Sequence, residues 1–151
     1  MKLKLKNIAP YLPYGLMIKV ENGVDTIESI DEEGTANIDC EFSYEMGEYK
    51  PILRPISSMT KEEAYELGTI LISEADMEDK EIGIGEMRIM GTTYPTIAYK
   101  DKEDEEYSVT IQFSSIGISG IDLIPYEAYE WLFKNNFDVF GLINRGLAVI
   151  K

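Results

Sequence analysis

The chain has 151 residues, of which 44% are hydrophobic, so it is long enough and apolar enough for one globular domain with a sizeable core. Its 14 basic residues are outnumbered by 28 acidic residues, which gives a net charge of -14. With no histidine and one cysteine, the chain excludes Ser-His-Asp and Cys-His catalysis, a structural zinc site of its own and an internal disulfide.

The negative charge is concentrated in the middle of the chain. Residues 1–20 carry four lysines and no acid, residues 21–106 carry a net charge of -17, and residues 107–151 are nearly neutral. An acidic middle repels phosphate groups, so we expect neither direct nucleic-acid binding nor binding to a membrane. The acids are expected to face water and keep the domain soluble; the alternative is a decoy surface that imitates nucleic acid. No apolar stretch has the length of a membrane span, and the lone Cys40 fits a reducing compartment, so we expect a cytoplasmic protein.

The first segment is punctuated by prolines. Pro10 and Pro13 prevent a long helix, so the sequence predicts a short helical turn around residues 5–11 that stops at Gly15. Two alternating apolar runs follow, at residues 16–20 and 24–30. The dipeptide Asn22-Gly23 between them predicts an antiparallel hairpin whose two turn residues both have positive φ.

The next strands are less regular. Residues 31–34 predict a turn and residues 35–42 a third strand, in which Cys40 is expected to be a small core residue and not a reactive thiol. Residues 50–57 contain Pro51 and Pro55, which argue against a central strand and favour an extended edge or docking segment.

A helix begins after Thr60, because Thr60 and Glu63 have the spacing of a capping box, and it is expected to run to about Ser73. The acidic stretch Glu74–Glu81 predicts a loop; its spacing does not match the twelve-residue calcium loop. The Gly-x-Gly within Ile82–Gly85 lacks the third glycine of a dinucleotide-binding loop, so we interpret its glycines as part of a strand or bulge.

The last part of the chain predicts three strands, a helix and a short closing strand. The strands are Glu86–Met90, Thr93–Lys100 and Glu106–Phe113, with an acidic hairpin tip at residues 101–106; residues 114–121 are expected to form an edge strand or a turn. Pro125 starts the helix, and Asn135-Asn136 end it in a left-handed conformation. Asp138 is expected to cap a second short helix before the closing strand at residues 147–150.

These elements predict one α+β domain over residues 1–151. We expect an antiparallel, twisted sheet of about five to seven strands with two or three helices packed on one face. We expect no catalytic residue, no cofactor and no metal ligand, because no nucleotide, metal or catalytic motif is present.

A set of binding-surface candidates remains. Arg54 lies between apolar neighbours, where it is either an anion contact or, as we expect, a structural cation paired with a carboxylate. The other candidates are one more arginine and the acids of the predicted hairpin tip: Arg88, Asp101, Glu103, Asp104, Glu105 and Glu106.

Three segments resemble those of one family. They are Ile8–Leu16 (IAPYLPYGL), Lys50–Ser57 (KPILRPIS) and Phe137–Ile143 (FDVFGLI), which is followed by Gly146-Leu147-Ala148. The family consists of small, uncharacterised proteins from phages and prophages of Bacteroides-like gut bacteria. The segments cover about a quarter of the chain and read as architecture, since prolines set chain direction and apolar residues dock on a core. The resemblance implies a phage-related origin and a role inside a bacterial cell; it supplies no site residue.

Three functions remain open. The first is a non-enzymatic accessory protein that binds a host or phage protein. The second is an anti-defence protein, either an acidic decoy of nucleic acid or a sponge for a nucleotide signal that uses tyrosines with Arg54, Arg88 and Arg145. The third is an enzyme built on carboxylates and a divalent metal. A homo-oligomer is compatible with all three.

Overall fold

The computed structural model describes residues 2–38, 42–103, 108–114, 117–119 and 124–151. Its α+β class confirms the prediction, but the described strands are distributed over three sheets and not over one. The chain divides into two compact units, the first made of Met1–Arg54 with Phe133–Lys151 and the second of Pro55–Leu132. Cys40, which was expected in the core, lies outside the described residues.

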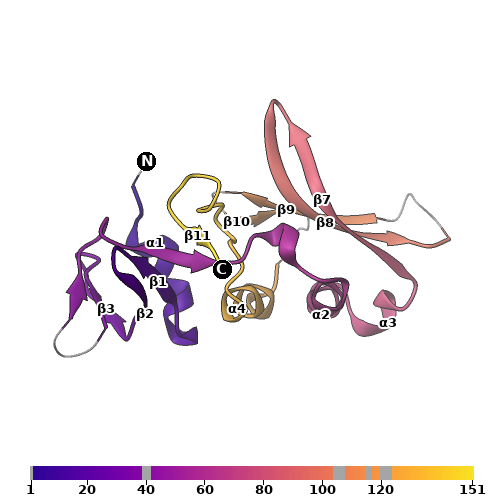
Figure 1. Ribbon diagram of the computed structural model, residues 1–151. Coiled ribbons are helices and arrows are strands. Elements are labelled where there is room, and N and C mark those ends of the chain that lie inside the picture. The colour runs from indigo at the N-terminus through magenta and orange to yellow at the C-terminus, as the bar shows by residue number, and fades with distance from the viewer. Residues whose placement is uncertain (1, 39–41, 104–107, 115–116, 120–123) are drawn as a thin grey trace. The chain divides into compact units, whose positions relative to one another are not determined.

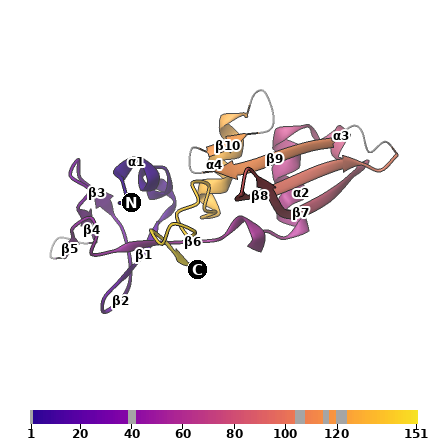
Figure 2. The same cartoon turned by 90° about the horizontal axis from the view of Figure 1, so that it is seen from above.

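The first unit contains a sheet with the strand order β11-β6-β1-β2 (Figures 1 and 2). β1 (Met17–Val20) pairs antiparallel with β2 (Gly23–Thr26) and β6 (Lys50–Leu53), and β11 (Val149–Ile150) pairs parallel with β6. The predicted hairpin is confirmed, but its turn lies one residue earlier than expected. Val20 is paired with Gly23, whose φ of 159° is extended, so the turn residues are Glu21 and Asn22.

Pro51 corrects the expectation that residues 50–57 avoid a central strand. β6 lies between β1 and β11, with Pro51 opposite Ile18 on β1. Pro51 has no backbone N–H to donate to a neighbouring strand. β11 pairs only with Ile52 and Leu53, so no strand residue lies beside Pro51 on the β11 side of β6. The short length of β11 is what makes a proline acceptable in this position.

A second, smaller sheet in this unit has the order β3-β4-β5. Its strands are two residues each, β3 (Ser29–Ile30), β4 (Ala36–Asn37) and β5 (Ser43–Tyr44), so the long strand expected at residues 35–42 is wrong. The predicted turn at residues 31–34 is confirmed. Asp31 Oδ1 accepts hydrogen bonds from the backbone N–H groups of Thr35 (2.8 Å) and Glu33 (3.0 Å), which hold the pKa of this carboxyl below its usual value.

The N-terminal segment folds as short helical turns, as predicted. α1 (Leu5–Ile8) continues into a 3₁₀ turn over Ala9–Tyr14, and Gly15 ends it in the left-handed region with φ 71°. Its apolar side chains join the core of the first unit with residues from the strands and the C-terminal segment. The buried core residues are Leu3, Ile8, Tyr11, Leu16, Ile18, Val20, Ile27, Ala36, Tyr49, Leu53, Leu142 and Ala148.

The three proline- and glycine-punctuated segments meet at Phe137. The Tyr11 hydroxyl donates to the Phe137 carbonyl at 2.7 Å and accepts from the Val139 N–H at 3.2 Å. Arg54 N–H donates to the Asn136 carbonyl, and Asp138 N–H donates to the Arg54 carbonyl, both at 2.8 Å. The Arg54 guanidinium lies 4.2 Å from the centre of the Phe137 ring. We call this cluster the Phe137 node.

The chain after the node forms turns, not the second helix that was expected at Asp138. The carboxylate nevertheless caps backbone groups, since it accepts from the N–H of Leu142 (2.7 Å) and Ile143 (2.8 Å). Gly141 has φ 62°, which interrupts helical geometry in the middle of the segment. The left-handed Asn136, with φ 58°, is confirmed.

The second unit combines a sheet of order β10-β9-β8-β7 with helices (Figure 1). The strands are β7 (Lys80–Ile89), β8 (Thr92–Asp101), β9 (Ser108–Ser114) and β10 (Gly117–Ser119). The helical elements are a 3₁₀ turn at Ile56–Ser58, α2 (Lys61–Leu71) and α3 (Glu74–Met77); α4 (Tyr126–Lys134) begins in this unit and ends in the first. The capping box of Thr60 and Glu63 is confirmed, whereas the acidic loop expected at residues 74–81 is a helical turn and the start of a strand.

Helix α2 packs on the sheet through Tyr99 of β8 (Figures 1 and 2). The buried Tyr99 hydroxyl donates to the Ala64 carbonyl at 2.8 Å. Gly68 lets the helix come this close, because a Cβ there would lie 2.7 Å from the Tyr99 ring and 2.6 Å from Met77. The close packing of the helix on its sheet therefore depends on the absence of a side chain at Gly68.

We expect Tyr11→Phe to lower the free energy of unfolding by about 1–3 kcal/mol, because it leaves the buried Val139 N–H and Phe137 carbonyl without this partner. Urea unfolding measures the change. The control is Tyr126→Phe, whose side chain is 73% exposed and should change stability by less than about 0.5 kcal/mol. Equal effects of the two substitutions would contradict the claim that the Tyr11 hydrogen bonds stabilise the fold.

Asp138 makes stability depend on pH in an unusual direction. Burial raises the pKa of its carboxyl, although the N–H groups of Ile143 and Leu142 and the charge of Arg145 act the other way. In the unfolded chain the carboxyl ionises at a lower pH than in the folded one, so its contribution to stability is lost as pH rises through the folded pKa. The stability advantage of the native chain over Asp138→Asn should thus shrink between acidic and neutral pH in urea titrations; an advantage that grows with pH would contradict it.

Candidate functional site

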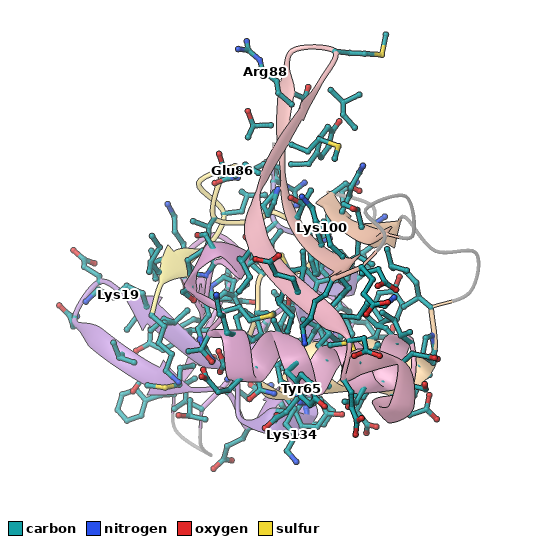
Figure 3. All side chains as sticks on the ribbon, turned by 90° about the vertical axis from the view of Figure 1, so that its right-hand side faces the viewer. Lys19, Tyr65, Glu86, Arg88, Lys100 and Lys134 are labelled. Carbon is teal, nitrogen blue, oxygen red and sulfur yellow. The ribbon has the colours of Figure 1, made fainter. Side chains whose placement is uncertain are left out.

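One hairpin extends beyond the sheet that carries it. β7 and β8 pair along their whole length, from Lys80 opposite Asp101 to Ile89 opposite Thr92. β9 covers β8 only from Thr96 to Lys100, and β7 is the edge strand. Residues 86–95 consequently form a two-stranded projection, which we call the hairpin arm; it is prominent in Figures 1 and 3. Four strand residues of β8 lie beyond Thr96, which corresponds to a reach of roughly 13 Å before the turn.

The arm ends in an unfavourable turn. Met90 and Gly91 connect the strands with φ values of 49° and 85°, the signs that a type I′ turn requires. Asn is the residue usually favoured at the first position, because a long side chain with a positive φ is strained. Met90 is fully exposed, with a relative accessibility of 101%, so no contact within the described residues compensates for this conformation.

The arm has one apolar and one polar face. Alternation along β7 places Met87 and Ile89 on the same face, each 38% exposed, and the register adds Tyr94 opposite Met87. The opposite face carries Glu86 and Arg88, with Arg88 nearer the tip (Figure 3). Near the base of the arm, Gln112 on β9 donates to the Met87 sulfur at 3.4 Å. The outer half of the apolar face is left to solvent.

The arm is electrically neutral on a strongly acidic chain. Between Ile82 and Tyr99 the only charged residues are Glu86 and Arg88. Among the acids of residues 21–103 whose side chains are described, none is buried, which confirms the expectation that the acidic middle faces water. The arm therefore presents apolar surface where the rest of this region presents carboxylates.

The predicted acidic tip is only partly described. Asp101 ends β8 and forms an ion pair with Lys80 at 3.1 Å, and it also accepts from the Glu103 N–H at 3.1 Å. The structure thus gives Asp101 a local structural role. Asp104, Glu105 and Glu106 lie outside the described residues, so their place as binding candidates is untested.

The three arginines are divided between the two units, with Arg54 and Arg145 in the first and Arg88 in the second. The Arg54 guanidinium lies over the Phe137 ring, and its expected pairing with a carboxylate stays a prediction. Arg145 donates to the carbonyls of Gly141 (3.3 Å) and Phe140 (3.2 Å) in the same unit. Arg88 belongs to the arm in the other unit.

Buried tyrosines account for the main upward pKa shifts. Burial raises the pKa of Tyr49 to about 12, and that of Tyr11 and Tyr99 further. Each hydroxyl donates to a backbone carbonyl, that of Gly34, Phe137 or Ala64 respectively. Tyr11 and Tyr49 therefore stabilise the interior of the first unit and Tyr99 that of the second, and all three side chains are buried.

The described residues contain no group of three or more acidic or cysteine side chains arranged to hold a metal ion. Within the same residues, no helix is long and apolar enough to cross a membrane.

Sequence reasoning singled out Arg88 but missed its surroundings. It identified both strands of the hairpin, yet it did not use the alternation of Met87 and Ile89 or the Met90-Gly91 step. A two-residue connection between strands, ending in glycine and flanked by exposed-face apolar residues, is the signal that indicates such an arm.

Comparison with known proteins supplies no relative: no family model, no curated protein and no solved structure matches this chain.

Proposed function

We propose that this protein is a non-enzymatic accessory protein of a phage or prophage, which acts in the cytoplasm of its bacterial host by binding another protein through the hairpin arm. The phage origin rests on the resemblance of the three segments at the Phe137 node. The mode of action rests on one observation, the fully exposed Met90 held at positive φ on a neutral, apolar tip.

A projection of this shape suits a protein groove. A small molecule needs a concave site that covers most of its surface, whereas the arm is convex and exposed on both faces. Met87 and Met90 carry flexible, polarisable side chains that adapt to an irregular apolar groove. The acidic body opposes approach to an anionic membrane, so a protein is the partner that the charges favour.

The strained turn supports the same proposal. Met90 costs stability through its positive φ and, being fully exposed, gains no packing within the chain in return. Contact with a binding partner is the simplest reason for a methionine at this position. The partner groove is expected to accept Met90 at its centre and to meet Arg88 with an acidic or carbonyl group at its edge.

We expect Met90→Asn to have opposite effects on stability and binding. Asn adopts positive φ more easily than Met, so the free energy of unfolding should rise by about 0.5–1 kcal/mol. Loss of the methionine should weaken binding to the partner about tenfold. Tyr126→Asn, at an exposed site on α4, is the control that should leave affinity unchanged. A stabilised variant with full affinity would contradict the proposal.

The partner is identified by site-specific photocrosslinking in host cells. A photoreactive residue at position 90 should capture one protein, which the same residue at position 126 should not capture. The captured protein, purified separately, should bind the native chain and lose affinity for the double variant Met87→Ser with Ile89→Ser. Identical capture from both positions, or an affinity insensitive to the double variant, would remove the arm as the binding site.

A further inference from the structure

The first unit carries a second exposed surface, on the outer face of the β11-β6-β1-β2 sheet. Ile18 and Val20 of β1 point into the core, so Met17 and Lys19 lie on the opposite face. The register adds residues of the neighbouring strands to that face. We call it the lysine face, and its residues are Met17, Lys19, Lys50, Ile52, Val149 and Lys151.

The lysine face contains a shallow apolar depression with basic residues at its edges. Its volume is about 480 Å³, and Met17, Ile52 and Val149 line it together with Lys19 and Lys151. Val24 and Ile150 also line it and are 46% and 63% exposed. No acidic residue lines the depression.

Two lysines of this face lie close enough to repel each other. Lys19 and Lys50 are directly opposite each other on β1 and β6, and like charges in this position repel and destabilise a sheet. Among the described residues, the structure shows no ion pair for either lysine. In a chain with twice as many acids as bases, this pairing concentrates two positive charges on one face of the sheet.

We propose that the lysine face docks an acidic amphipathic helix of a partner protein. The apolar row of Met17, Ile52 and Val149 accepts the apolar stripe of the helix. Lys19 and Lys50 meet carboxylates on one flank. Lys151, whose N–H donates to the Leu53 carbonyl, meets carboxylates on the other. The two flanks are separated by about three to four residues of β6, or roughly 10–13 Å, which matches the diameter of a helix with its side chains.

Other occupants fit less well. A second copy placed by two-fold symmetry would set lysines against lysines, since such a contact brings the same patch together. An anionic membrane is attracted by three lysines but repelled by the net charge of -14. A partner helix that carries its acids beside an apolar stripe satisfies both the charge and the apolar surface of the lysine face.

The test uses a synthetic helical peptide of roughly 18 residues, with a leucine stripe flanked by glutamates, and a matched peptide with lysines in place of the glutamates. Fluorescence anisotropy should show binding of the acidic peptide, weakened by added salt, and at least tenfold weaker or absent binding of the basic one. The double variant Lys19→Glu with Lys50→Glu should weaken binding of the acidic peptide at least tenfold. The control is Lys61→Glu with Lys134→Glu, which makes the same change in net charge on α2 and α4 and should have less than a threefold effect.

Folding is checked separately from binding. The single variant Lys19→Glu replaces a like-charge pair by an opposite pair with Lys50, so its melting temperature should rise while it binds the acidic peptide more weakly. Equal binding of the two peptides, binding of neither, or equal losses in the double variant and its control would overturn the proposal. Dimerisation abolished by Lys19→Glu in sedimentation, or binding to vesicles of phosphatidylglycerol and phosphatidylcholine in place of the peptide, would assign the face to another occupant and overturn it as well.

The lysine face belongs to the first unit and the hairpin arm to the second. The variants of one unit leave the residues of the other unchanged, so the acidic peptide tests the lysine face whether or not a partner is captured at position 90.

Discussion

The hydrogen bonds of the Tyr11 hydroxyl are the interaction on which the first unit depends. They join a segment near the start of the chain to the backbone of Phe137 and Val139, more than 120 residues later. The Tyr11 ring also meets Phe133 edge to face, with ring centres 4.9 Å apart. A contact between such distant segments forms against a large loss of chain entropy, so it must be buried and fully hydrogen-bonded to persist.

Arg54 also belongs to the Phe137 node, and it lies where the chain enters the second unit. It is the last residue before that unit, and it is hydrogen-bonded to Asn136 and Asp138, shortly after the chain returns at Phe133. The two ends of residues 55–132 are thereby held together by backbone hydrogen bonds and by the stacking of Arg54 on Phe137. A unit inserted in this way needs only its two ends to be fixed. Its hairpin arm is then free to carry surface that its own core does not require.

Sequence reasoning succeeded where structure is local and failed where it depends on distant partners. The capping box of Thr60 and Glu63, the end of the first helical turn at Gly15 and the left-handed Asn136 follow from residues within a few positions of each other. The central place of Pro51 does not, because it depends on β11 being too short to reach it. The Phe137 node was seen only as three separate docking segments. The arm escaped prediction because its exposure depends on where β9 ends.

The acidic surface would give the two proposed binding surfaces their selectivity. Exposed apolar residues such as Met90 and Ile150 would invite indiscriminate association on a neutral molecule. On a chain with a net charge of -14, most acidic partners and other copies of the same chain are repelled before contact. A partner of the lysine face must overcome that repulsion by meeting Lys19 and Lys50 directly, and a partner of the arm must reach past it to the neutral tip. The excess of carboxylates thus contributes to specificity by repelling wrong partners, since specificity is a difference between the affinities of right and wrong partners.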